Sequence, residues 1–166
     1  MRADKIYLVG FMASGKSSLA RELGRRLGWQ VEDIDDRIEA REHRAIRDIF
    51  ARDGEAYFRA VERMVVQDLL PLRHAVVATG GGTFADTVNR AALLSDGAVF
   101  WIDVPLATLM ARTPLDGRRP LAANRAQFES LLASRLPAYA QAHVVLDGAR
   151  SSIGELADVV VDWLGR

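Results

Sequence analysis

The chain contains no cysteine among its 166 residues. This absence excludes disulfides and thiolate zinc sites, and it is typical of proteins from a reducing compartment. Neither charge is in excess, because 22 Lys and Arg residues stand against 22 Asp and Glu residues. No overall field therefore draws the protein to nucleic acid or to anionic lipid. We expect no nucleic-acid partner, and any recognition of an anion must be local.

Long apolar runs are also missing. The apolar run within MRADKIYLVGFM (1–12) is broken too early for a secretory signal or a membrane span. No repeat, low-complexity tract or linker divides the sequence, and its length suits one hydrophobic core. We therefore expect a single domain over 1–166 that is cytoplasmic, has no membrane partner and is monomeric.

What the sequence does contain is an alternation of two kinds of segment. Short apolar runs predict strands at Ile6–Val9, Gln30–Val31, Ala75–Ala78, Ala98–Ile102 and His143–Leu146. Stretches with helical periodicity lie between them, at Leu19/Leu23/Leu27, Ala56–Leu70 and Ile153–Leu164. Strands separated by helices predict right-handed crossovers, and hence a three-layer α/β/α fold with a five-stranded parallel sheet. Ligands of such sheets bind beyond the carboxyl ends of the strands.

The first candidate site follows the first predicted strand. GFMASGKS (10–17) matches G-x-x-x-x-G-K-[ST], the phosphate-binding P-loop, and it opens the first predicted helix. Backbone N–H groups and the helix N-terminus would hold a phosphate, Lys16 would reach the β and γ phosphates, and Ser17 would bind Mg²⁺. The alternative is a glycine turn capped by serines. The pattern favours a P-loop nucleotide-binding fold with ATP contacts from Ala13, Ser14, Gly15, Lys16, Ser17 and Ser18.

Two acids follow the second predicted strand, in VEDIDD (31–36). On an extended backbone Asp33 and Asp35 would face the same way, toward the phosphates. We expect Asp33 to serve the metal and Asp35 to orient, or take a proton from, an attacking hydroxyl. The alternative makes Asp35 the cap of a helix that runs to Arg41.

Further motifs occur in a specific order. They are DIFARDGEAYFRAVE (48–62), TGGG (79–82), RRPL (118–121) and RLPAY (135–139). Together with the P-loop and Asp33–Asp35, this order and spacing resembles that of the shikimate kinases, from Lys5 to the last predicted helix. The chain departs from the family at Ala13, where glycine is usual. Alanine is acceptable there if the backbone angle φ is negative, and it costs stability if φ is positive.

The residues of these motifs indicate what an acceptor would look like. Two guanidinium groups, Arg59 and Arg135, suit a carboxylate, as do backbone amides at the triple glycine 80–82. Asp35 suits hydroxyl groups, and two phenylalanines would wall a ring. Arg59 could instead pair with acids on its own helix, and Arg135 could be solvated. The resemblance implies that shikimate is bound by Asp35, Arg59, Gly80, Gly81, Gly82 and Arg135. Phe50 and Phe58 would supply the apolar wall, and we expect an acceptor-binding helical region over about 34–62.

A polar segment, TPLDGRRPLAANR (113–125), is the longest candidate loop. Long loops in compact domains are usually functional, and this one is basic, so we expect a mobile lid over about 113–126 that closes on the triphosphate. The resemblance implies that Arg119 is its catalytic arginine, beside Lys16 and Asp35. It also implies Arg112 near the nucleotide, and Arg150 is a further candidate at the adenine.

The resemblance implies ATP-dependent phosphorylation of shikimate at its 3-hydroxyl, with Mg²⁺, in the pathway to chorismate and the aromatic amino acids. One alternative is a kinase for another small hydroxy acid such as gluconate. Another is a nucleotide-binding regulator without transferase activity. The regulator has no chemical use for Asp35 or for an acceptor pocket, so the sequence favours the kinase.

Overall fold

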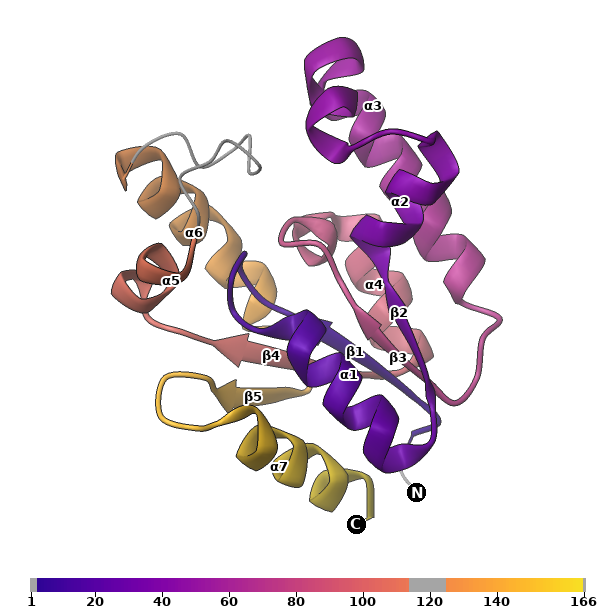
Figure 1. Ribbon diagram of the computed structural model, residues 1–166, viewed down its shortest axis with the longest axis vertical. Coiled ribbons are helices and arrows are strands. Elements are labelled where there is room, and N and C mark those ends of the chain that lie inside the picture. Colours follow the sequence, from indigo (N-terminus) through magenta and orange to yellow (C-terminus); the bar gives the residue numbers. More distant parts are fainter. Residues whose placement is uncertain (1–2, 114–124, 166) are drawn as a thin grey trace.

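The computed structural model describes residues 3–113 and 125–165. Its five strands are β1 (Lys5–Val9), β2 (Gln30–Asp33), β3 (Ala75–Ala78), β4 (Ala98–Asp103) and β5 (Val144–Asp147). The α-helices are α1 (Lys16–Leu27), α2 (Ile34–Glu42), α3 (Ile46–Leu69), α4 (Thr87–Asp96), α5 (Leu106–Arg112), α6 (Arg125–Tyr139) and α7 (Ile153–Gly165), and a short 3₁₀ turn, η1, spans Thr83–Ala85 (Figure 1).

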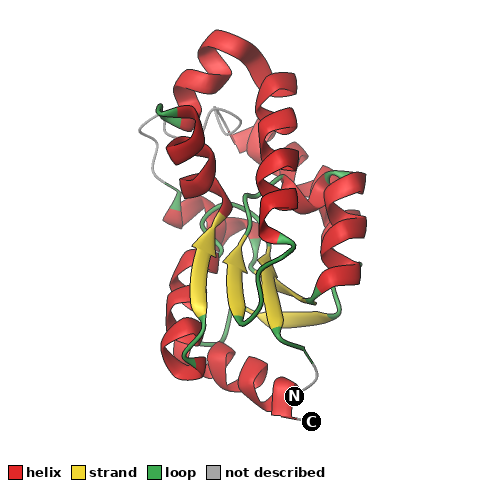
Figure 2. Ribbon diagram, turned by 90° about the vertical axis from the view of Figure 1, so that its right-hand side faces the viewer, coloured by secondary structure: helices red, strands yellow, loops and turns green. Residues whose placement is uncertain are grey.

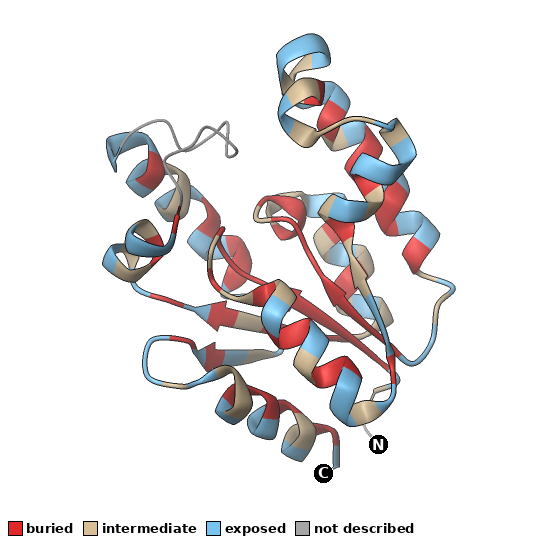
Figure 3. Ribbon diagram, in the orientation of Figure 1, coloured by how far each residue is buried: buried red, intermediate tan, exposed pale blue. Residues whose placement is uncertain are grey.

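All strand pairs are parallel, in the order β2-β3-β1-β4-β5. The central strands β1 and β3 are buried along their whole length, whereas the edge strands β2 and β5 are largely accessible (Figure 3). Continuous apolar strands are what a sheet covered on both faces requires. The predicted α/β fold with five parallel strands is therefore confirmed.

The strand order fixes which face each helix covers. The step from β1 to β2 runs in one direction along the sheet, and the later steps run in the other. Because right-handed crossovers place helices on a face set by that direction, α1 lies on one face and α3, α4 and α6 lie on the other. α7 returns to the face of α1 and packs against it. These are the three predicted layers.

The carboxyl ends of the strands all meet at one edge of the sheet, and α2 with the first part of α3 stands beyond that edge (Figure 2). Within α3 the backbone of Gly54 leaves the helical region, with φ 81° and ψ 177°. Only glycine adopts such angles without strain, so Gly54 divides α3 into two helical pieces. The predicted helix Ala56–Leu70 corresponds to the second piece.

A buried ionic cluster lies near the amino-terminal ends of the strands, opposite the end where α2 lies. The Lys5 Nζ donates to Asp96 Oδ2 at 2.6 Å and to the carbonyl oxygens of Leu69 and Leu70. The Tyr7 hydroxyl donates to the same Asp96 oxygen at 2.6 Å. These bonds join β1 to the ends of α3 and α4, far from the edge where ligands of such sheets bind.

In the described ranges 3–113 and 125–165, we find no helix with the length and apolar character needed to cross a membrane.

Candidate active site

The loop between β1 and α1 has the shape that phosphate binding needs. Gly10 has φ 147°, and a Cβ there would lie 2.9 Å from the Ile102 carbonyl oxygen, so no side chain fits. Gly15 is the N-cap residue of α1 and has φ 101°, which turns the loop into the helix N-terminus. The Nζ of Lys16 donates to the carbonyl oxygens of Gly10 and Phe11, each at 2.8 Å. The loop thus curls around its own lysine, as a P-loop does around a phosphate.

A cavity of about 540 Å³ lies over this loop. Seven of the eight described residues predicted to contact ATP line it, namely Ala13, Ser14, Gly15, Lys16, Ser17, Ser18 and Arg112. The rest of the lining comes from the ends of other strands and the start of α7, namely Asp33, Asp35, Thr79, Gly81, Gly148, Ser151, Ser152, Ile153 and Leu156. We call this space the nucleotide cavity.

Ser17 and Asp33 present oxygen ligands side by side. The Ser17 Oγ donates to Asp33 Oδ2 at 2.7 Å, and the other Asp33 oxygen accepts from the Asp35 backbone N–H at 3.0 Å. Asp33 ends β2 and caps α2, and Asp35 lies in the first helical turn. The expectation that both acids share an extended backbone is therefore wrong, because the chain turns into α2 directly after Asp33. Both acids nevertheless line the nucleotide cavity.

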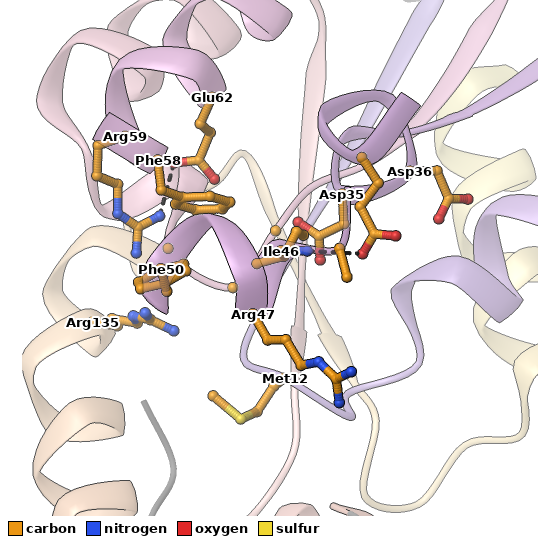
Figure 4. Close-up of a pocket in the computed structure, with 15 residues that line it drawn as sticks. Met12, Asp35, Asp36, Ile46, Arg47, Phe50, Phe58, Arg59, Glu62 and Arg135 are labelled. Carbon is orange, nitrogen blue, oxygen red and sulfur yellow. Dashed lines mark hydrogen bonds and ion pairs between the residues drawn. The ribbon is translucent and has the colours of Figure 1, made fainter. Parts of the chain in front are cut away.

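A second cavity, of about 590 Å³, is lined mainly by residues of α2, α3 and the loop after β3 (Figure 4). We call it the acceptor cavity. Every residue predicted to contact the acceptor lines it: Asp35, Phe50, Phe58, Arg59, Gly80, Gly81, Gly82 and Arg135. The two phenylalanine rings pack on each other with centroids 4.7 Å apart and form an apolar wall. The cavity thus combines three arginines, four carboxylates, one apolar wall and bare backbone; the charged residues are Arg47, Arg59, Arg135, Asp35, Asp36, Glu39 and Glu62.

The triple glycine brings the charged groups together. A Cβ on Gly80 would lie 2.9 Å from Asp35 Oδ1, and one on Gly81 would lie 2.9 Å from Arg135 Nη1. A Cβ on Gly82 would lie 2.5 Å from the Arg59 guanidinium. Each glycine therefore faces the end of at least one charged side chain, and a larger residue at its position would have to displace that group. Gly80, Gly81 and Gly82 thus form a wall of bare backbone, which we call the glycine wall, and the ends of the Asp35, Arg135 and Arg59 side chains lie against it.

Arg59 has carboxylate partners on its own helix. It pairs with Glu62 at 2.8 Å and with Glu55 at 3.4 Å, which is the arrangement considered as an alternative to acceptor binding. Burial lowers the pKa of its guanidinium, but the two glutamates outweigh this effect and the net pKa is raised. Glu62 is 1% exposed and also accepts from the Thr83 hydroxyl. The pairing with Glu62 holds Arg59 against the cavity instead of removing it, because both residues line the cavity.

Arg135 is held in a different way. Its side chain is buried, and its guanidinium lies over the ring of Phe11 at 5.4 Å from the centroid. Burial lowers its pKa, and the nearby Arg59 adds to that effect. No ion pair joins Arg135 to a carboxylate within the part of the chain that the structure describes. A buried cation of this kind favours binding of an anion, since the anion would restore the lost solvation.

The two cavities meet. Asp35 and Gly81 line both of them, so a group bound in one cavity lies beside a group bound in the other. The model of the shikimate kinase family matches residues 12–165. The chain belongs to the shikimate kinase family. It is 43% identical to the shikimate kinase of Persephonella marina over 84% of this chain and 85% of that protein. It is 38% identical to the shikimate kinase of Moorella thermoacetica over 96% and 95% of the two chains.

Solved structures agree with this membership. The shikimate kinase of Acinetobacter baumannii, in complex with shikimate, superposes with a TM-score of 0.92 at 32% identity, over 97% of this chain and 92% of that one. A deoxyadenosine kinase of M. mycoides superposes with a TM-score of 0.64 at 17% identity, which shows a shared fold alone.

Ala13, where the family usually has glycine, adopts the less favourable of the two backbone conformations considered above. Its φ is +63°, in the left-handed region. An alanine in this region is strained because its Cβ approaches the following carbonyl oxygen. The P-loop keeps its shape, and the cost falls on stability.

Two predicted arginines are not part of the described site. Arg119 and most of the predicted lid, 114–124, lie outside the described residues. Arg150 is exposed and is not among the residues lining the nucleotide cavity. Its backbone N–H is held by Asp147 in the turn after β5. The neighbouring Ser151, Ser152 and Ile153 line the cavity instead. They follow the last predicted strand, and this position is the one feature of the sequence that could have indicated them as site residues.

Proposed function

We propose that this protein transfers the γ-phosphate of ATP to the 3-hydroxyl of shikimate, giving 3-phosphoshikimate and ADP on the route to the aromatic amino acids. The observation that carries this proposal is that a P-loop cavity and a cavity lined by Arg47, Arg59 and Arg135 share Asp35 and Gly81. In phosphoryl transfer the protein does little covalent chemistry, and catalysis depends mainly on holding the donor phosphate and the acceptor hydroxyl in line. Two adjoining cavities meet this requirement.

The acceptor cavity supplies a partner for each part of the shikimate molecule. Arg59 and Arg135 would bind the carboxylate, and the apolar wall of Phe50 and Phe58 would contact the ring. Asp35 accepts hydrogen bonds and stands where the cavities meet, so it would orient the 3-hydroxyl and take its proton as the phosphoryl group arrives. Membership of the shikimate kinase family and the cation pair both support shikimate over an uncharged acceptor.

In the nucleotide cavity Lys16 would turn from its backbone acceptors to the β and γ phosphates. Arg112 would lie near the nucleotide, and Arg119 would close on the phosphates from the predicted lid. Each cation would stabilise charge on the transferred group.

The Ser17 hydroxyl and the Asp33 carboxylate fit Mg²⁺, because both are hard oxygen ligands and lie 2.7 Å apart at the edge of the P-loop. When bound, the ion would neutralise charge on the β and γ phosphates. We propose that the enzyme works as a cytoplasmic monomer.

The test is a coupled ADP-release assay with ATP and Mg²⁺, run with shikimate, gluconate, quinate or no acceptor. We expect release only with shikimate, and we expect Asp35→Asn to abolish it while ATP binding by calorimetry is kept. Asp68→Asn, at an exposed carboxylate of α3, is the matched control and should retain wild-type activity. Equal release with every acceptor, or with none added, would refute the proposal. Release of ADP with gluconate but not with shikimate would show that the protein is a kinase for another hydroxy acid.

A further inference from the structure

Tyr139 is a buried residue behind the acceptor cavity with no role assigned so far. It ends α6 and is 1% exposed. Its ring packs against Trp101, with centroids 5.9 Å apart and planes inclined by 31°. It is absent from the residues that line either cavity, so it would not touch a substrate.

The Tyr139 hydroxyl nevertheless reaches the cavity wall, because it donates a hydrogen bond to the carbonyl oxygen of Gly81. Burial raises the pKa of Tyr139 to about 12, although Arg135 and Arg59 oppose the shift. The hydroxyl therefore keeps the proton that it donates throughout the neutral range. This bond ties the end of α6 to the loop after β3.

This hydrogen bond also sets the direction of a neighbouring N–H. The Gly81 carbonyl and the Gly82 N–H belong to one peptide group, and the described chain contains no cis peptide bond. In a planar trans peptide the carbonyl and the N–H point in opposite directions. When the Gly81 oxygen points back to Tyr139, the Gly82 N–H points away from Tyr139. All three glycines line the acceptor cavity and Tyr139 does not, and we infer from this that the Gly82 N–H points toward the cavity.

Arg135 is fixed from the same place. It lies four residues before Tyr139, so both side chains extend from one face of α6. Its guanidinium is near enough to the Tyr139 hydroxyl for each group to shift the pKa of the other, and its Nη1 lies 2.9 Å from the position that a Cβ on Gly81 would take. The Tyr139 hydroxyl and the buried cation thus both lie beside Gly81.

We propose that Tyr139 is a positioning residue for the acceptor: its hydroxyl locks the Gly81–Gly82 peptide so that the Gly82 N–H faces the acceptor cavity beside Arg135. Without this bond the glycine peptide would be free to rotate, because glycine has few steric barriers. The inference rests on the proposed function, since it assumes an anionic acceptor in this cavity. It concerns binding of the acceptor and not of ATP.

The direct test is Tyr139→Phe, which removes the hydroxyl and keeps the ring against Trp101. We expect the KM and the calorimetric Kd for shikimate to rise about 10-fold, since a hydrogen bond to a charged ligand is lost or misaligned. The KM for ATP should stay within about 2-fold, because the nucleotide cavity does not depend on this peptide.

Tyr7→Phe is the matched control. Tyr7 is also a fully buried tyrosine whose hydroxyl donates to the protein, to Asp96 at 2.6 Å, but it lies at the opposite edge of the sheet. Both variants should lower the melting temperature by roughly 2–6 °C, the usual cost of one buried hydrogen bond. Only the Tyr139 variant should change the use of shikimate.

A second readout does not depend on activity. A hydrogen bond to a carbonyl polarises its peptide group. The ¹⁵N resonance of Gly82 should therefore shift in Tyr139→Phe and stay in place in Tyr7→Phe. An unchanged Gly82 resonance, or equal changes of the shikimate Kd in the two variants, would overturn the inference. If the wild-type protein neither binds nor phosphorylates shikimate, the proposed function fails and the inference fails with it. A functional wild type with an unaffected Tyr139→Phe overturns the inference alone.

Discussion

Ala13 provides a prediction whose size follows from one backbone angle. Its φ of +63° places an alanine in the left-handed region, where strain costs about 1–2 kcal/mol. Glycine has no such strain, but it loses about 0.5–1 kcal/mol more conformational entropy on folding. The difference predicts that Ala13→Gly stabilises the protein by about 0.5–1 kcal/mol. For a chain of this length that is a rise of about 1–4 °C in melting temperature, measurable by calorimetry.

Gly28 has nearly the same φ as Ala13, so Gly28→Ala is the reverse substitution at a comparable backbone conformation. It ends α1 with φ 67° and ψ 27°, and no atom lies within 4 Å of the position of a Cβ. Gly28→Ala therefore introduces the left-handed strain without a clash, and it should destabilise by about the same 0.5–1 kcal/mol. If Ala13→Gly lowered the melting temperature while Gly28→Ala lowered it too, the strain assigned to Ala13 would be refuted.

Three further predictions concern charged groups. Arg59→Ala should raise the KM for shikimate about 10–100-fold in the coupled assay, as loss of a charge-assisted pair does, with the KM for ATP nearly unchanged; equal losses would mean that Arg59 serves both substrates. Asp96→Asn should lower the free energy of unfolding in urea by about 3–5 kcal/mol, because it leaves the buried Lys5 without its carboxylate; a loss below about 1 kcal/mol would contradict a buried ion pair. Asp86 caps α4 and pairs with Arg63; burial raises its pKa, but the Arg63 bond and the capped N–H groups outweigh this and the net pKa is lowered. The contribution of the Asp86 carboxylate to folding stability is therefore fully present above its unfolded pKa of about 3.9, and it is lost as pH falls through the lower pKa of the folded state. In an acid titration, Asp86→Asn should lose less stability than the wild type does over this pH range.

Much of the sheet could be predicted because burial of parallel strands leaves a simple pattern. β3 has the predicted bounds, Ala75–Ala78, since its four residues are all apolar. β2 extends two residues beyond the prediction, to Asp33. Its last two residues are polar and carry no strand pattern, and their extended backbone results from pairing with β3. A pairing between distant strands cannot be predicted from the local sequence.

The helices were harder to predict where tertiary contacts form them. α6 has no clear apolar face, and its Pro137 suggests a stop, yet the helix continues to Tyr139. The first piece of α3 lies within the helical region expected over about 34–62, but its bounds could not be predicted because Gly54 interrupts the periodicity that a sequence window detects. Both segments carry site residues, and their direction is set by packing beyond the sheet.

The site was predictable in its composition and less so in its geometry. Motifs indicated Arg59, Arg135, the triple glycine 80–82 and Asp35 as acceptor contacts, and the structure brings all of these to one cavity. The argument that placed Asp35 on an extended strand was wrong, because Asp33 caps a helix that begins at once. The contacts of Tyr139 could not be predicted, since they join residues 58 positions apart.

The wall formed by Gly80, Gly81 and Gly82 has a consequence for inhibitors. A point substitution there would push its new side chain into Asp35, Arg135 or Arg59. Resistance to a compound that lies flat on this wall would therefore require displacing a group that we propose binds the acceptor. Escape mutations should arise elsewhere in the lining, for example at Ile46 or Arg47, and compounds that avoid those two positions should select resistance more slowly.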